Sequence, residues 1–326
     1  MRASLFATAA ALLAPSTAVV QQLSPLSVIA FPGIGTWPIR IAQEKGFFVR
    51  NGIEVNLSPT PNSVFQITSL VEGKFDIAMT AADNVVAYVE GQGEVSLSQA
   101  PDLFIFMGGS PSLPVVASIP EIKDYPELRG RTVAVDALTT GYAFVLFDLL
   151  RRNGLQVSDY KIEAAGGTLA RWRGMREGKY AAALLTSPFD LIARADGFNL
   201  LQYARDAYGH YEESVGSTRR AWALAHEDKL VAYIKGYVSA VEWLRETNNR
   251  DEAISILRRH FSLSAELAAG TYTNFLGSRG VAAKAQLVLA GMRKMLELRS
   301  EYGRPQKSLT DPLLYYDARY YERAVR

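Results

Sequence analysis

The sequence predicts an α/β fold of two similar lobes, each a mainly parallel sheet with helices on both faces, joined by a two-stranded hinge. The first observation is that EGKFDIAMT at residues 72–80 is echoed by REGKYAAALLT at residues 176–186. The second is that RNGIEV at residues 50–55 is matched by RNGLQV at residues 152–157, in the same order. The third is that strand-like apolar runs alternate with helix-like ones in both copies. Such self-similarity predicts a duplicated unit.

The first copy alternates strands and helices. A Gly-rich turn at residues 32–36 links its first strand to its first helix, and Gly73 ends the helix before its third strand. Asp83 is expected to cap the helix that follows. The strands are expected at residues 26–31, 54–57 and 75–79, and the helices at residues 37–44, 63–71 and from Asp83 to about residue 90.

The second copy repeats this order. Its first helix opens at Gly141 and stops at Asn153 and Gly154, a pair typical of a helix end. Strands are expected at residues 132–135, 161–163 and 180–185, with further helices at residues 169–177 and after Pro188. Because strand and helix alternate, each lobe should contain a largely parallel sheet.

Two segments are expected to cross between the lobes. The sequence GGSPSLP at residues 108–114 suits the first crossing, and the second is expected between Tyr211 and Arg219. Beyond it the pattern is helical, and an aromatic stripe at residues 315–321 is expected to dock the terminal helix onto a lobe. The predicted division places residues 25–110 and 218–326 in lobe 1, and residues 111–217 in lobe 2.

The first 18 residues are expected to be a signal peptide that is cleaved near Ala18. Arg2 precedes an apolar stretch at residues 5–14, and Ser16-Thr17-Ala18 fits a small-residue cleavage site. A short buried helix is the alternative. The net charge of +2 with dispersed signs argues against nucleic acid as a partner, and the absence of cysteine excludes disulfides and thiol chemistry. We therefore expect release into the periplasm.

A ligand site is predicted between the lobes. Ligands of open α/β sheets bind beyond the carboxyl ends of the strands. Four loops should therefore face one cleft: residues 32–37, 80–84, 136–142 and 186–190. The repeated threonines, Thr80 and Thr186, end equivalent strands and are expected at the edge of this cleft, one on each side.

Each candidate in these loops also has a structural interpretation. Thr139, Thr140 and Asp83 can serve as helix caps, and the glycines at 33 and 35 can serve only the turn. Trp37 is either core packing or a flat platform for a planar ligand, and we favour the platform because it follows a Gly-rich turn. Arg171 fits a solvated helix face better than a partner for a ligand carboxylate.

The sequence offers few catalytic constellations. His210, His226 and His260 lie outside the predicted cleft loops and lack metal-ligand spacing. No P-loop and no Gly-x-Ser-x-Gly motif occurs. A carboxylate pair drawn from Asp83, Asp136 and Asp190 is conceivable, but capping or a turn explains each. No catalytic residue, metal or cofactor is expected.

Four stretches resemble a known family: GTWPIRIAQEKGFFVRNGIEV, EGKFDIAMTAADN, LRGRTVAVDALTTGYAFVLFDLLRRNGL and GGTLARWRGMREGKYAAALLTSP. They look like the nitrate/sulfonate/taurine and thiamine-pyrimidine branch of type II periplasmic binding proteins. The resemblance implies that the four loops line the ligand pocket. The residues carried over are Gly35, Thr36, Trp37, Ala81, Asp83, Asn84, Thr139, Thr140, Gly141, Ser187, Pro188 and Phe189, with Tyr142 as a further aromatic wall.

The resemblance also implies a function. The chain would be a monomeric extracytoplasmic receptor that closes on a small-molecule solute and delivers it to a membrane ABC permease. Asp83 would repel a strongly anionic ligand, so an aromatic, heterocyclic or amide-bearing solute is expected rather than a sulfonate or nitrate. Two alternatives stay open: a pyrimidine-synthase-like enzyme of the same superfamily, and a sensory ligand-binding subunit.

Overall fold

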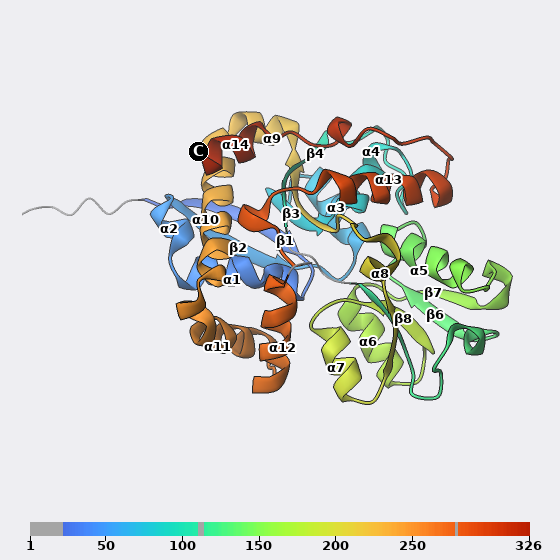
Figure 1. Ribbon diagram of the computed structural model, residues 1–326. Coiled ribbons are helices and arrows are strands. Elements are labelled where there is room, and N and C mark those ends of the chain that lie inside the picture. The colour runs from blue at the N-terminus through green and yellow to red at the C-terminus, as the bar shows by residue number, and fades with distance from the viewer. Residues whose placement is uncertain (1–21, 110–113, 278–279) are drawn as a thin grey trace, which may run out of the picture.

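The computed structural model describes residues 22–109, 114–277 and 280–326. The expected signal peptide at residues 1–18 lies outside the described residues, as does the middle of the first expected crossing. Figure 1 shows two α/β bodies side by side, with the C-terminal helices wrapped around the first of them.

The first sheet has the strand order β2-β1-β3-β10-β4. β1 runs parallel to β2 and β3, whereas β10 runs antiparallel to β3 and β4. The strands are β1 (Ser24–Ala30), β2 (Ile53–Pro59), β3 (Ile77–Ala81), β4 (Leu103–Gly108) and β10 (Ser214–Arg219).

The second sheet repeats this arrangement with the order β7-β6-β8-β5-β9. β6 runs parallel to β7 and β8, and β5 runs antiparallel to β8 and β9. Its strands are β5 (Val115–Ser118), β6 (Thr132–Val135), β7 (Lys161–Ala164), β8 (Ala182–Leu185) and β9 (Asn199–Tyr203). In each sheet the antiparallel strand, β10 or β5, is the one through which the chain enters from the other sheet. The two-lobed α/β prediction is confirmed.

The first-lobe helices are α1 (Trp37–Glu44), α2 (Phe47–Arg50), α3 (Ser63–Val71) and α4 (Ala82–Val89). Those of the second lobe are α5 (Gly141–Arg152), α6 (Thr168–Arg176), α7 (Phe189–Ala195) and α8 (Ala204–Tyr208). The side chain of Thr140 caps α5 by accepting a hydrogen bond from the Ala143 N–H at 3.4 Å. Asp83 was expected to cap α4, but the cap position is Ala81 and Asp83 lies in the first turn.

The remaining helices follow β10 in the chain. They are α9 (Arg220–Ala225), α10 (Glu227–Arg245), α11 (Arg250–Phe261), α12 (Ala265–Leu276), α13 (Leu289–Tyr302) and α14 (Arg319–Val325). Tyr320 and Tyr321 of α14 are buried in the core that contains α1 and α10, as the aromatic stripe predicted. The lobe boundary expected after residue 217 falls inside β10, which pairs with the first sheet from Ser214 onward.

Helix α13 belongs to both lobes. Its Met292, Met295 and Leu296 are buried in a core cluster of the first lobe, together with residues of α3 and α4. Its Leu298 is buried in a core cluster of the second lobe, together with residues of α5. Figure 1 shows α13 lying along the first body and next to α5 of the second. The two sheets are therefore connected by a packed helix in addition to the chain crossings.

Candidate functional site

A cavity lies between the two sheets, at the ends of the strands where the sequence placed it. About 710 Å³ of empty space, part of it open to solvent, lies between its walls. The walls come from four loops that follow β1, β3, β6 and β8, from the start of α6, and from Glu213 and Ser214 at the entry to β10.

The two lobes touch each other around this cavity. The Ile34 N–H of the first lobe donates to the Ser187 carbonyl of the second at 3.2 Å. In the opposite direction, the Gly167 N–H donates to the Pro61 carbonyl at 3.0 Å. The Ser63 N–H, at the start of α3, donates to Asp136 Oδ2 at 3.3 Å. Because backbone and side-chain hydrogen bonds join the lobes, this structure represents a closed arrangement.

Seven of the predicted site residues line the cavity, and both repeated threonines do as well. The Asn84 amide donates to Thr80 Oγ1 at 3.1 Å, and Thr186 Oγ1 lies 3.2 Å from Thr168 Oγ1. Each threonine is therefore fixed by a neighbour within its own lobe. The seven residues are Gly35, Ala81, Asn84, Thr140, Gly141, Tyr142 and Ser187.

Trp37 does not line the cavity, and its predicted role as a platform is replaced by a packing role. A 3₁₀ turn at Ile34–Thr36 lies within the Gly-rich segment, and Trp37 is the first residue of α1. Its ring is fully buried and packs edge-on against Tyr272 and Phe275 of α12, at centroid distances of 6.0 and 5.1 Å. Thr36 is also buried, and its hydroxyl donates to the Gly33 carbonyl at 3.0 Å.

Three predicted residues of the second lobe also lie outside the cavity walls. Phe189 packs against a core cluster beneath the second sheet, and Pro188 precedes it at the start of α7. Thr139 binds across to the first lobe, because its N–H and its hydroxyl both donate to Glu94 Oε2, at 3.1 and 3.0 Å. These residues hold the loops and the lobes in place at the edge of the site.

Asp83 is held in a buried ion pair with Arg299 of α13. Arg299 Nε donates to Asp83 Oδ1 and Arg299 Nη2 to Asp83 Oδ2, each at 2.6 Å, and both side chains are almost inaccessible to solvent. Nη2 also donates to the Thr139 carbonyl at 2.6 Å, so this guanidinium joins the lobes. The expected repulsion of anionic ligands by Asp83 is therefore wrong, because Arg299 neutralises its charge.

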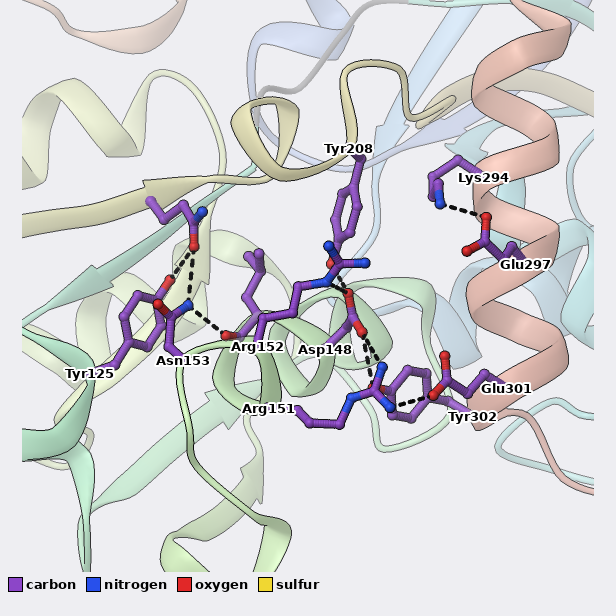
Figure 2. Close-up of polar contacts among 12 residues, drawn as sticks. Tyr125, Asp148, Arg151, Arg152, Asn153, Tyr208, Lys294, Glu297, Glu301 and Tyr302 are labelled. Atoms are coloured by element: carbon purple, nitrogen blue, oxygen red, sulfur yellow. Dashed lines mark hydrogen bonds and ion pairs between the residues drawn. The ribbon is translucent and has the colours of Figure 1, made fainter.

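A second polar cluster, centred on Asp148 of α5, ties α13 to the second lobe. Figure 2 shows Asp148 between Arg151, Arg152, Tyr208 and Tyr302. Tyr302 donates to Asp148 Oδ1 at 3.2 Å, and Tyr208 donates to Oδ2 at 2.8 Å. Burial raises the pKa of this carboxyl, but the hydrogen bonds from the arginines and Tyr208 outweigh burial, so the net shift is downward. The Asp148 carboxyl is therefore ionised at neutral pH.

Several cavity residues were missed by the sequence analysis. Arg171 was expected on a solvated face, yet it is 1% exposed and lines the cavity. Arg171 lies four residues before the apolar Met175, so the two side chains share one face of α6. This spacing could have indicated from the sequence that Arg171 is buried. Phe31 and Glu213 also line the cavity. No pattern marked Glu213, because it lies where the chain crosses between lobes.

The remaining acidic candidate, Asp190, lies beside the cavity in the first turn of α7. Its carboxylate accepts from Ser187 Oγ at 2.8 Å and from Tyr203 Oη at 3.1 Å. Burial raises its pKa in spite of these hydrogen bonds. Among the described residues, no group of three His, Cys, Asp or Glu side chains is arranged to hold a metal ion.

A family model described as NMT1/THI5 like matches residues 35–250. No curated protein matches the chain. In the described residues, no helix is both long and apolar enough to cross a bilayer.

Solved structures share the fold at low sequence identity. The periplasmic nitrate-binding protein NrtA from Synechocystis PCC 6803 is 12% identical with a TM-score of 0.78, over 93% of this chain and 89% of that one. The alkanesulfonate-binding protein SsuA from Xanthomonas axonopodis pv. citri, bound to MOPS, is 14% identical with a TM-score of 0.72, over 91% and 99%. The desulfurization enzyme DSZB is 14% identical with a TM-score of 0.63, over 93% and 99%. These matches agree with the type II periplasmic binding protein fold.

Proposed function

Because the chain belongs to the NMT1/THI5-like family, we propose that it is a periplasmic solute-binding protein that captures a small organic molecule between its lobes for an ABC importer. The observation that carries this proposal is the cavity enclosed jointly by the two lobes. Two similarly folded neighbours are, by their names, a periplasmic nitrate-binding protein and an alkanesulfonate-binding protein. Both support a receptor function.

The mechanism follows from the contacts around the cavity. A solute that touches both lobes adds its binding free energy to the closed state alone, so it shifts the equilibrium from open to closed. The contacts between Ile34 and Ser187 and between Gly167 and Pro61 form only when the lobes meet. The permease would then recognise the closed, loaded form.

The cavity walls favour an aromatic, heterocyclic or amide-bearing solute. Phe31 and Tyr142 supply apolar walls from opposite lobes, which suits a planar or partly apolar molecule. Asn84, Thr80 and Thr186 supply polar groups at the edge of the cavity. This preference now rests on the wall residues, since Asp83 is neutralised by Arg299.

An enzymatic function is the second candidate, because the desulfurization enzyme DSZB shares the fold. The lining of the cavity offers it little support. The three histidines of the chain are absent from the cavity walls; His210 and His260 line other surface hollows. We therefore propose a binding function without catalysis.

A solute library tested by thermal shift, followed by small-angle scattering of the hits, examines the proposal. We expect at least one small organic solute to raise the Tm and to make the protein more compact. Phe31→Ala should reduce the shift, whereas Phe65→Ala, which removes an exposed ring of α3, should not. A library without a binder, or turnover of a bound solute detected by mass spectrometry, contradicts the proposal.

Export needs a separate measurement. If the protein is periplasmic, its N-terminus purified from its own host should begin just after Ala18, and the protein should leave the cells on osmotic shock. An N-terminus at Met1 and retention in the cytosolic fraction would favour the enzyme.

A further inference from the structure

Asp136, a residue of the cavity wall, has a carboxylate oxygen that finds no partner among the described residues. Asp136, at the end of β6, is only 7% exposed, and its Oδ1 is buried without a hydrogen bond. Its Oδ2 accepts a long hydrogen bond of 3.3 Å from the Ser63 N–H. A buried polar atom that has lost its water and gained no partner costs about 1–3 kcal/mol, and more when it is charged. Such an atom in a ligand cavity indicates a missing donor.

The neighbouring arginine does not supply that donor. Arg171 Nε donates to the Leu184 carbonyl at 3.0 Å, and its two terminal nitrogens donate to the Gly166 carbonyl at 2.6 Å and to Thr168 Oγ1 at 3.0 Å. Each guanidinium nitrogen is therefore held by its own lobe. Burial lowers the pKa of Arg171 to about 10, and the charge of Asp136 opposes that shift through space.

The charge of the cavity wall points in the same direction. Asp136 and Arg171 both line it, and the guanidinium of Arg171 donates to acceptors other than Asp136. An anion placed against the Asp136 carboxylate between the closed lobes would be repelled in a medium of low dielectric constant, whereas a cation would be attracted.

We propose that the cavity selects solutes bearing a cationic or N–H donor group, such as an amidinium, an ammonium or an amino-heterocycle, which Asp136 Oδ1 accepts. This inference rests on the proposed solute-binding function and adds the charge class of the solute and the residue that reads it. The aromatic walls, Phe31 and Tyr142, enclose the rest of the molecule.

The proposal has a consequence in the absence of solute. An unpartnered buried carboxylate opposes folding of the empty protein, and its charge is balanced only when the solute is bound. Asp136→Asn removes the charge and keeps the shape. The ligand-free variant should therefore have a higher Tm than the wild type.

The test uses benzamidine and benzylamine as cations, and benzoate, benzenesulfonate and nitrate as anions, together with the best solute from the library. Affinities are measured by calorimetry for the wild type, Asp136→Asn and Asp196→Asn. Asp196 is an exposed acid at the end of α7, so its variant has the same change in net charge far from the cavity. We expect the donor-bearing solutes to bind the wild type and Asp196→Asn, and to bind Asp136→Asn at least about tenfold more weakly, as for the loss of one charge-assisted hydrogen bond.

The outcomes separate this inference from the function on which it rests. A wild type that binds the anions, or a library solute without a donor group, overturns the inference and leaves the receptor function standing. Equal affinities in the wild type and Asp136→Asn, or a lower Tm of the empty variant, also overturn it. A wild type that binds no solute of either set and none in the library overturns the receptor function as well.

Discussion

Removal of Arg299 is expected to be among the most destabilising single substitutions in the chain. Arg299 and Asp83 form two hydrogen bonds of 2.6 Å, and their side chains are 0% and 2% exposed. Arg299→Met leaves the carboxylate buried without its counter-ion, a loss of about 3–5 kcal/mol. It also removes the donor that binds the Thr139 carbonyl in the second lobe.

A double-mutant cycle separates the contribution of the Arg299–Asp83 ion pair to the free energy of unfolding from the effect of lost packing. Asp83→Asn alone leaves a buried guanidinium unpaired, whereas the double variant leaves no charge. Asn is chosen because it has the size of Asp and the space at this position is tight. A Cβ atom added at Gly141 would lie only 2.5 Å from Asp83 Cγ. The double variant should lose less stability than the sum of the single variants by at least about 2 kcal/mol.

Urea unfolding followed by far-UV circular dichroism measures these free energies. Arg319→Met is the matched control: the Arg319 guanidinium also donates to both oxygens of one carboxylate, that of Asp317, but its side chain is 70% exposed. Solvent screens an exposed ion pair and weakens it, so the control should change stability little. Additive single variants, or an Arg299→Met loss no greater than that of the control, would refute the assigned role of the buried pair.

Three further substitutions test other parts of the structure. Gly141→Ala should lower the free energy of unfolding by about 1–3 kcal/mol in urea unfolding, since its new methyl would clash with Asp83 and with Tyr211 Oη. Burial raises the pKa of Glu212 to about 8, so the folded state holds a proton that the unfolded state releases near its ordinary pKa of 4.5. Stability should therefore fall as the pH rises from about 5 to 8, by up to about 1.4 kcal/mol per pH unit, and Glu212→Gln should abolish that slope in unfolding curves at several pH values. Trp37→Phe should lower the Tm and leave the affinity of any solute found by calorimetry unchanged, because Trp37 lies in the core; a weaker affinity would restore its role as a platform.

The sequence predicted the location of the cavity better than the orientation and charge of the side chains around it. The carboxyl ends of β3 and β8 lie next to Thr80 and Thr186. They place the following loops at the edge of the sheet whatever the side chains of those loops are, so the repeat was enough to place the cavity. The resemblance to the family of binding proteins is likewise confirmed by the matching family model. The orientation of Trp37 was not predictable in this way, because it depends on α12, which is more than 200 residues away in the chain.

Charge was the property that local reasoning could not assign, and the two lobes illustrate why. Asp83 and Asp190 occupy the first turns of the helices that follow β3 and β8, the third strands of the two copies. The first is neutralised by Arg299, 216 residues away, from a helix outside the duplicated unit. The second accepts hydrogen bonds from Ser187 and Tyr203 instead, and burial raises its pKa. Similar sequence positions thus hold carboxyl groups whose charge is balanced in different ways, and neither lines the cavity. The proposed charge preference of the site therefore rests on Asp136, whose Oδ1 has no hydrogen-bond partner among the described residues.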